Sequence, residues 1–212
     1  MNTLSSTLWP WMALAGLGAF HGLNPAMGWL FAVALGLHRQ SRGLVVLALA
    51  PIALGHAVAV GAVLLAVIVF GTVVDATFLG RGAGILLIAW AATHTLAGHR
   101  TPLRIGMQTG LAGLALWSFM VASAHGAGFM LIPALLSLCV SPGMGGELTA
   151  STSVPISFVA LAVHTGVMLA VIGAVSLIVY DQGLAFLRRG WLNMDILWSV
   201  ALAGGGIFLL AG

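Results

Sequence analysis

Long apolar stretches alternate with short polar segments along the whole chain. A membrane-spanning helix needs roughly 20 predominantly apolar residues. Stretches of about this length or longer run at residues 8–37, 44–70, 79–98, 107–139, 156–180 and 193–211. Most of the charged residues lie in the segments between them. The pattern predicts an all-α polytopic membrane protein with about six transmembrane helices.

The first and fourth stretches are longer than one crossing requires, and both contain residues that interrupt helices. These residues are Asn24-Pro25 and Gly28 in the first stretch, and Gly126 and Gly128 in the fourth. Proline removes a backbone hydrogen bond from a helix interior. Two interpretations remain open for each stretch, a single tilted helix or a broken helix with a re-entrant piece.

The arginines indicate the orientation of the chain. Those that follow the first, third and fifth stretches are Arg39, Arg42, Arg100, Arg104, Arg188 and Arg189. They therefore share one face, and the positive-inside rule makes that face cytoplasmic. We expect a multi-pass protein of the cell inner (cytoplasmic) membrane with both termini outside.

The two halves of the chain resemble each other. At an offset of 108 residues, Arg81-Gly82 aligns with Arg189-Gly190 and Trp90 with Trp198. At offsets of 108 and 104, pairs of histidines also align, as described below. We therefore expect a single membrane domain built from two three-helix repeats, at residues 1–106 and 107–212. Three helices is an odd number, so the second copy enters the membrane from the opposite side, as in the inverted repeats of many secondary transporters.

The composition excludes several classes of protein. Apolar residues make up 61% of the 212 residues and charged residues only 5%, whereas a soluble domain carries about 25% charged residues. Such a chain cannot cover itself with a water-facing surface, which excludes a soluble enzyme, a disordered protein and a nucleic-acid binder. The single cysteine excludes an internal disulfide and a thiolate metal cluster. The first six residues contain no basic residue, so we expect no cleaved signal peptide.

Histidines are the strongest candidates for chemistry. The first, second, fourth and fifth stretches each contain one near the middle, namely His21, His56, His125 and His164. The repeat pairs His21 with His125 and His56 with His164, so four imidazoles could meet at a central site. Ionisable residues inside a membrane usually mark a site or a pathway, and neutral imidazole suits zinc, copper, iron, nickel and cobalt. The alternative is that each ring hydrogen-bonds across a helix pair in a structural role.

Three further residues are candidates at this site. His94, nearer the cytoplasmic end of the third stretch, is a fifth possible ligand or an exit step. Asn24 offers an amide, and the neighbouring Pro25 is expected to free the backbone carbonyl of His21. Asp195, about one turn into the sixth stretch, could couple protons, bind the ion or pair with an arginine at the interface.

The motifs resemble a family of small exporters. A repeated three-helix unit, with His21-Gly22 and Asn24-Pro25 in the first helix and Leu54-Gly55-His56-Ala57 in the second, is similar to the LysE superfamily of six-helix membrane transporters. Within that superfamily the chain is most similar to the NicO-type nickel/cobalt transporters. The resemblance implies a transporter fold with a midplane site, and it implies that His21 and His56 are ligands on the ion pathway.

These observations favour a transporter over an enzyme. The leading hypothesis is an inner-membrane transporter of a transition-metal cation (nickel, cobalt, zinc, copper or iron) through a midplane histidine site, with proton coupling through the same imidazoles. One alternative is a membrane-embedded redox protein that depends on a metal or on haem. Another is an exporter of a small organic solute. The expected partners are the lipid bilayer and the ion or solute, and the sequence leaves open whether the chain forms a homo-oligomer.

Overall fold

The computed structural model describes residues 3–71, 76–97, 110–139, 150–182 and 194–211, with backbone alone at some helix ends. Throughout these residues the secondary structure is helical, which confirms the all-α prediction. The helices are α1 (Thr3–Leu23), η1 (Pro25–Met27), α2 (Trp29–His38), α3 (Arg42–Leu47), α4 (Leu49–Gly71), α5 (Ala76–Ala97), α6 (Leu111–Ala124), α7 (Ala127–Met130), α8 (Ile132–Cys139), α9 (Ala150–Gln182) and α10 (Met194–Ala211). Two continuous helical segments, 42–71 and 151–182, are long and apolar enough to cross a membrane. The expected boundary between residues 106 and 107 lies outside the described residues.

The first apolar stretch is a broken helix. We call residues 24–28 the first break. Asn24 caps η1, because its side-chain Oδ1 accepts the N–H of Ala26 at 3.0 Å. Pro25 follows at the first position of η1, where its missing N–H costs nothing. Gly28 then takes φ 125°, a conformation that residues with a side chain rarely adopt, and α2 begins after it.

The fourth apolar stretch is broken as well, between α6 and α7. We call His125 and Gly126 the second break. His125 is the C-cap of α6, and Gly126 has φ 66° in the left-handed region, where glycine carries no steric penalty. In both stretches the broken helix therefore replaces the alternative of one tilted helix.

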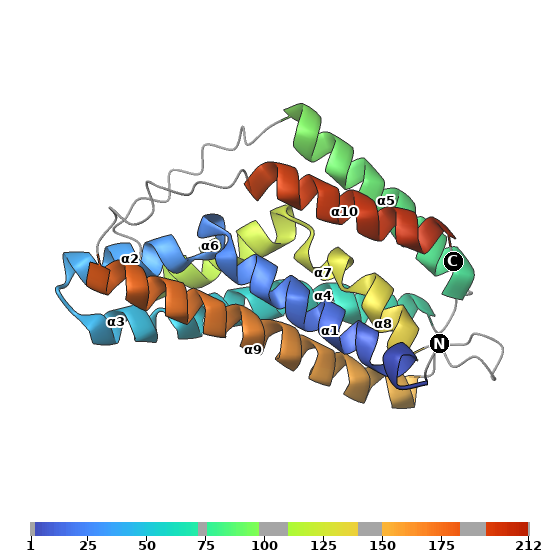
Figure 1. The fold of residues 1–212 in the computed structure, drawn as a ribbon, viewed down its shortest axis with the longest axis horizontal. Helices are drawn as coiled ribbons and strands as arrows, with labels where there is room; N and C mark the ends of the chain where they lie inside the picture. The colour runs from blue at the N-terminus through green and yellow to red at the C-terminus, as the bar shows by residue number, and fades with distance from the viewer. Residues whose placement is uncertain (1–2, 72–75, 98–109, 140–149, 183–193, 212) are drawn as a thin grey trace.

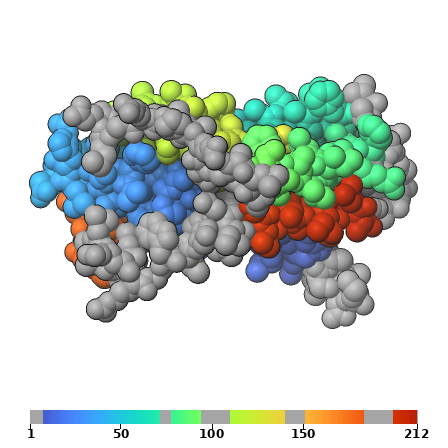
Figure 2. All heavy atoms as spheres, turned by 90° about the horizontal axis from the view of Figure 1, so that it is seen from above, coloured from blue at the N-terminus to red at the C-terminus, as the bar shows by residue number. Residues whose placement is uncertain are grey.

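The helices associate in three long pairs. α1 lies along α9, α4 along α6, and α5 along α10 (Figure 1). Glycines allow the close approach of α1 and α9. A Cβ atom at Gly18 would clash with the carbonyl oxygen of His164, and one at Gly22 would lie 2.6 Å from the carbonyl oxygen of Met168. Seen from above, α10 and α5 lie against each other on one face of the molecule (Figure 2).

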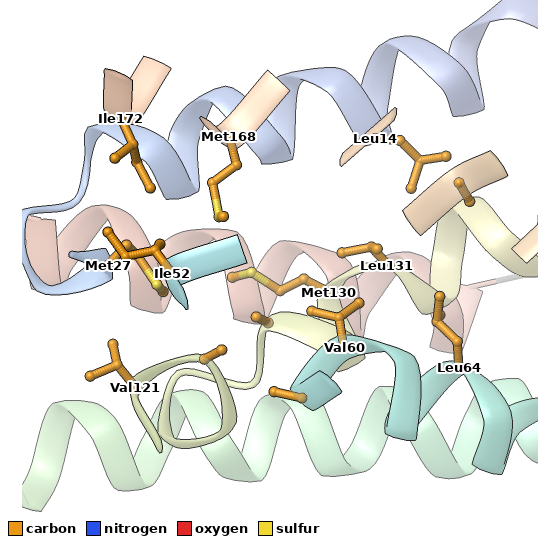
Figure 3. Close-up of a cluster of buried hydrophobic side chains, with 14 of the residues drawn as sticks. Leu14, Met27, Ile52, Val60, Leu64, Val121, Met130, Leu131, Met168 and Ile172 are labelled. Carbon is orange, nitrogen blue, oxygen red and sulfur yellow. The ribbon is translucent and has the colours of Figure 1, made fainter. Parts of the chain in front are cut away.

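The apolar core lies where α1, α4 and α9 meet the broken segments. Its buried side chains include Met27, Ile52, Val60, Leu131 and Met168, which come from η1, α4, the α7–α8 connection and α9 (Figure 3). The two chain ends lie at one end of the bundle (Figure 1). At the start of α3 and the end of α9, Arg42 pairs with Asp181 at 3.1 Å.

Candidate functional site

Three histidines that are far apart in the sequence lie together inside the bundle. His21 on α1, His56 on α4 and His164 on α9 are each 0% exposed. The distances between ring centres are 4.9 Å for His21 and His164, 5.4 Å for His56 and His164, and 5.6 Å for His21 and His56. We call these three residues the histidine cluster. The close pairs α1–α9 and α4–α6, together with the contact of α4 with α9, bring them to one place.

Backbone carbonyls hold two rings of the histidine cluster. Nδ1 of His21 lies 2.7 Å from the carbonyl oxygen of Leu17, and Nδ1 of His164 lies 3.2 Å from that of Leu14. A carbonyl can only accept, so each Nδ1 carries the proton and Nε2 holds the lone pair of the neutral ring. Metal-binding histidines are commonly oriented in this way by a carbonyl on the other ring nitrogen.

His56 differs from its two neighbours. Among the described residues, neither of its ring nitrogens has a hydrogen-bond partner, and neither does Nε2 of His164. Its ring stacks on that of His164 with an interplanar angle of 19°. A buried polar group without a partner lowers stability by about 1–3 kcal/mol, so residues of this kind call for a functional explanation. No hydrogen bond within the described residues fixes the orientation of the His56 ring.

His125 lies at the second break, beside the histidine cluster. It is 5% exposed, its Nδ1 donates to the carbonyl oxygen of Val121 at 2.9 Å, and it lies near His21. His21 lies in the last turn of α1, and His125 caps α6. The C-terminal end of a helix carries a partial negative charge. Two helix ends of this kind beside the same rings favour a cation there.

Of the three supporting residues, the structure describes the side chain of Asn24 but not those of His94 and Asp195. The Oδ1 of Asn24 is engaged in the η1 cap. The expectation that Pro25 frees the carbonyl of His21 is wrong, because the chain turns at the first break and the N–H of Asn24 donates to that carbonyl at 3.2 Å. His94 and Asp195 belong to α5 and α10, but their side chains lie outside the described residues.

The spacing of the rings matches a metal site, whereas their orientation does not. Two imidazoles bound to one tetrahedral zinc at about 2.0–2.1 Å have ring centres roughly 5 Å apart. In the conformation described, however, no group of three or more His, Cys, Asp or Glu side chains within the described ranges is placed to hold a metal ion. Within the cluster, the rings of His56 and His164 are stacked, with an interplanar angle of 19°. The donors are close together and do not converge on one point.

Among the described residues, no acidic side chain lies beside the histidine cluster. Of the four acidic residues in the sequence, Asp181 is the one whose side chain the structure describes. It lies roughly 25 Å along α9 from His164, at 1.5 Å per residue, and it is 46% exposed beside Arg42. The described donors near the rings are therefore neutral.

Tryptophans stabilise both breaks, a role that the sequence analysis missed. At the first break, the indole of Trp29 donates to the carbonyl of Leu23 at 3.1 Å, and Trp117 on α6 donates to that of Ala26 at 2.9 Å. At the second break, Trp90 on α5 donates to the carbonyl of Ala124 at 2.9 Å. Helix ends leave carbonyls without partners, and these three indole N–H groups serve as the missing donors. The available signal was a tryptophan inside an apolar stretch, away from the interfaces where tryptophan gathers.

Comparison with known proteins adds no relative. No protein-family model, no characterised protein and no solved structure matches this chain. The function is therefore argued from the chemistry of the histidine cluster and from the arrangement of the helices around it.

Proposed function

We propose that this protein is a multi-pass membrane transporter of a transition-metal cation, and that the ion passes through the histidine cluster. The observation that carries the proposal is the gathering of His21, His56 and His164 in the bundle interior, with ring centres no more than 5.6 Å apart. Neutral imidazole is a common ligand for zinc, copper, nickel and cobalt. The ends of α1 and α6 add partial negative charge beside the rings.

The apolar exterior supports a membrane location. Besides the two helical segments long enough to span, the surface carries many exposed large apolar side chains, including Phe78 on α5 at 73% and Phe158 on α9 at 70%. Soluble proteins rarely expose large apolar patches. A bilayer removes this cost, and the six apolar stretches provide six crossings. The inner membrane, with both termini outside, remains the location that we propose from the arginines.

The packing of the helices supports an inverted repeat. If residues 1–106 and 107–212 are two copies, α1 corresponds to α6, α4 to α9, and α5 to α10. Exchanging the copies then turns the α1–α9 pair into the α6–α4 pair and leaves α5–α10 unchanged. These are the three most extensive helix pairs among the described residues. Inverted repeats, broken helices and a central site are features of secondary transporters, and they support the proposed similarity to the LysE superfamily.

In the proposed mechanism, the ion closes the site by turning one ring. His21 and His164 are held at Nδ1 and keep their Nε2 lone pairs. His56 is not held by a hydrogen bond in the described part of the chain, so its ring turns out of the stack and directs a nitrogen at the ion. Protons compete with metals for imidazole nitrogens. We therefore propose that the movement of the ion is coupled to the movement of protons through the same rings.

The geometry favours an ion over the two alternatives. Axial histidines on opposite faces of a haem have ring centres about 6 Å apart with the macrocycle between them, whereas the rings of the histidine cluster contact one another. An anionic organic solute is better served by helix N-termini, which carry partial positive charge. His21 lies in the last turn of α1, and His125 caps the C-terminus of α6, which is much longer than the four-residue α7 that begins after it.

The test is metal binding and uptake by the full chain. The purified protein in detergent, and then in lipid vesicles, is offered Zn²⁺, Ni²⁺, Co²⁺ or copper, and the bound and transported metal is measured by elemental mass spectrometry. We expect His56→Ala to abolish both. The matched control is His38→Ala, which changes an exposed histidine at the end of α2. Undiminished uptake by a folded His56→Ala variant would overturn the proposal.

A further inference from the structure

Three buried methionines belong to the apolar core between the helices that carry the histidine cluster. Met168 is 0% exposed, Met27 is 1% exposed and Met130 is 4% exposed. They come from α9, η1 and α7, so both broken segments and α9 contribute one each. Met168 projects from α9 toward Met27 and Ile52 (Figure 3). The apolar core at this point therefore offers sulfur atoms as well as hydrocarbon.

Met168 is placed to reach the site. It follows His164 by four residues on α9, so the two side chains lie on the same face of the helix one turn apart. The backbone carbonyl oxygen of Met168 packs against Gly22 on α1, the residue next to His21. Met168 therefore lies between the same two helices that bring His21 and His164 together.

The uncharged donor set limits the charge of the ion. In a medium of low dielectric constant, the solvation cost of an ion rises with the square of its charge, and buried charges need compensating partners. The described donors at the rings are imidazoles and backbone carbonyls, and Met168 adds a thioether one turn along α9 from His164; all of them are neutral. A divalent ion would leave two uncompensated charges among them. A monovalent ion leaves one, at roughly a quarter of the Born cost.

We infer that the ion handled by the histidine cluster is a soft monovalent cation, Cu(I), held by imidazoles together with the thioether of Met168. Thioether and imidazole ligands together select Cu(I) among the common metals, whereas magnesium, calcium and manganese prefer oxygen. Ag(I) has the same charge and similar softness, so it serves as a redox-stable probe. This inference rests on the proposed function and specifies its substrate class.

The first experiment measures affinity in matched variants. Full-length protein in detergent competes for Cu(I), under ascorbate and without oxygen, against a chromophoric Cu(I) chelator, and parallel titrations use Ag(I) and Zn²⁺. Met168→Leu keeps the volume and apolar character of the side chain. We expect it to weaken Cu(I) and Ag(I) binding at least about tenfold, since even loss of an outer partner costs 10–100-fold. The control is Met12→Leu on α1, where the methionine is 71% exposed.

A second measurement needs no variant. X-ray absorption at the copper edge of the wild-type protein loaded with Cu(I) distinguishes sulfur from nitrogen neighbours. A sulfur neighbour that disappears in Met168→Leu supports the inference, and a nitrogen-only shell overturns it.

The outcomes separate the inference from the proposed function. If Zn²⁺ or Ni²⁺ binds at least as tightly as Cu(I), and His56→Ala abolishes that binding while Met168→Leu does not change it, the inference is wrong and the proposed function stands. If the wild-type protein binds none of these ions, both are wrong.

Discussion

The first and second breaks each interrupt a long apolar stretch beside a histidine, but they rely on different residues. The first has a side-chain cap from Asn24, two indole donors and Gly28 at φ 125°. The second has Gly126 at φ 66° and one indole donor, that of Trp90. A break with several independent supports is the more rigid one. The comparison teaches that fixed geometry is concentrated beside His21, while the break beside His125 has fewer supports and is the one better suited to rearrange in the proposed transport cycle.

The largest expected difference between the breaks concerns their glycines. Gly28→Ala should lower the free energy of unfolding by about 3 kcal/mol, because a residue with a Cβ is strained at such a φ. The added Cβ would also lie 2.8 Å from Cδ1 of Ile52. Gly126→Ala should cost about 1 kcal/mol, since the left-handed region is open to alanine at that cost, and its Cβ would meet nothing closer than 3.6 Å.

Unfolding of both variants in detergent, followed by circular dichroism, measures this difference. Gly126→Asn is the control, because asparagine tolerates the left-handed region, and it should behave nearly like the wild type. Equal losses at Gly28 and Gly126 would mean that the two breaks are equally constrained.

The next effect comes from the indole donors. Trp117→Phe keeps an aromatic side chain but leaves the carbonyl of Ala26 without its indole partner, and we expect a loss of about 2 kcal/mol. Trp90→Phe removes the corresponding donor at the second break, where the bond is more exposed, and should cost less. Thermal unfolding of the two variants side by side measures the order. A greater loss in Trp90→Phe would reverse the comparison.

The cap of the first break gives a smaller effect. Asn24→Ala removes the acceptor for the N–H of Ala26, and loss of such a cap typically costs about 1 kcal/mol. Asn24→Ser retains an oxygen at this position and should restore most of the stability. If alanine and serine prove equally destabilising, Asn24 acts through something other than the cap, and direct contact with the transported ion becomes the better explanation.

The smallest expected effect lies far from both breaks. Arg42 and Asp181 form an ion pair whose side chains are 62% and 46% exposed. Exposed pairs contribute at most about 0.5–1 kcal/mol and are screened by salt. Arg42→Ala should therefore shift the unfolding midpoint by no more than the loss of a cap does, and raising the salt concentration should shrink even that shift. A larger effect would mean that the pair fastens α3 to α9.

The sequence predicted where the helices lie better than how they are broken. Each predicted stretch overlaps the helices found there, because apolar length is a local property, although some helices extend further, as α9 (150–182) does beyond the predicted 156–180. Whether a stretch with Asn24-Pro25 or Gly126 tilts or breaks depends on donors from elsewhere in the chain. Trp117 reaches the carbonyl of Ala26 from 91 residues away. No local pattern contains that information.

The sequence predicted which histidines belong to the candidate site, but it did not predict how their rings are arranged. The repeat pointed to His21, His56, His125 and His164 because it paired them. That three of these rings lie in mutual contact, and that His56 has no hydrogen bond within the described part of the chain, follows from packing. Met168 was missed because methionine inside an apolar stretch usually fills core space.

The ring of His56 has one more consequence, for stability as a whole. A protein that keeps a buried imidazole without a hydrogen bond gives up folding free energy that a leucine would have supplied, which is a trade of stability against activity. An ion that binds the folded state alone raises the free energy of unfolding with the logarithm of its concentration above the dissociation constant. If the proposed function holds, the empty protein would be the form more easily unfolded by heat, and the loaded protein the more resistant one.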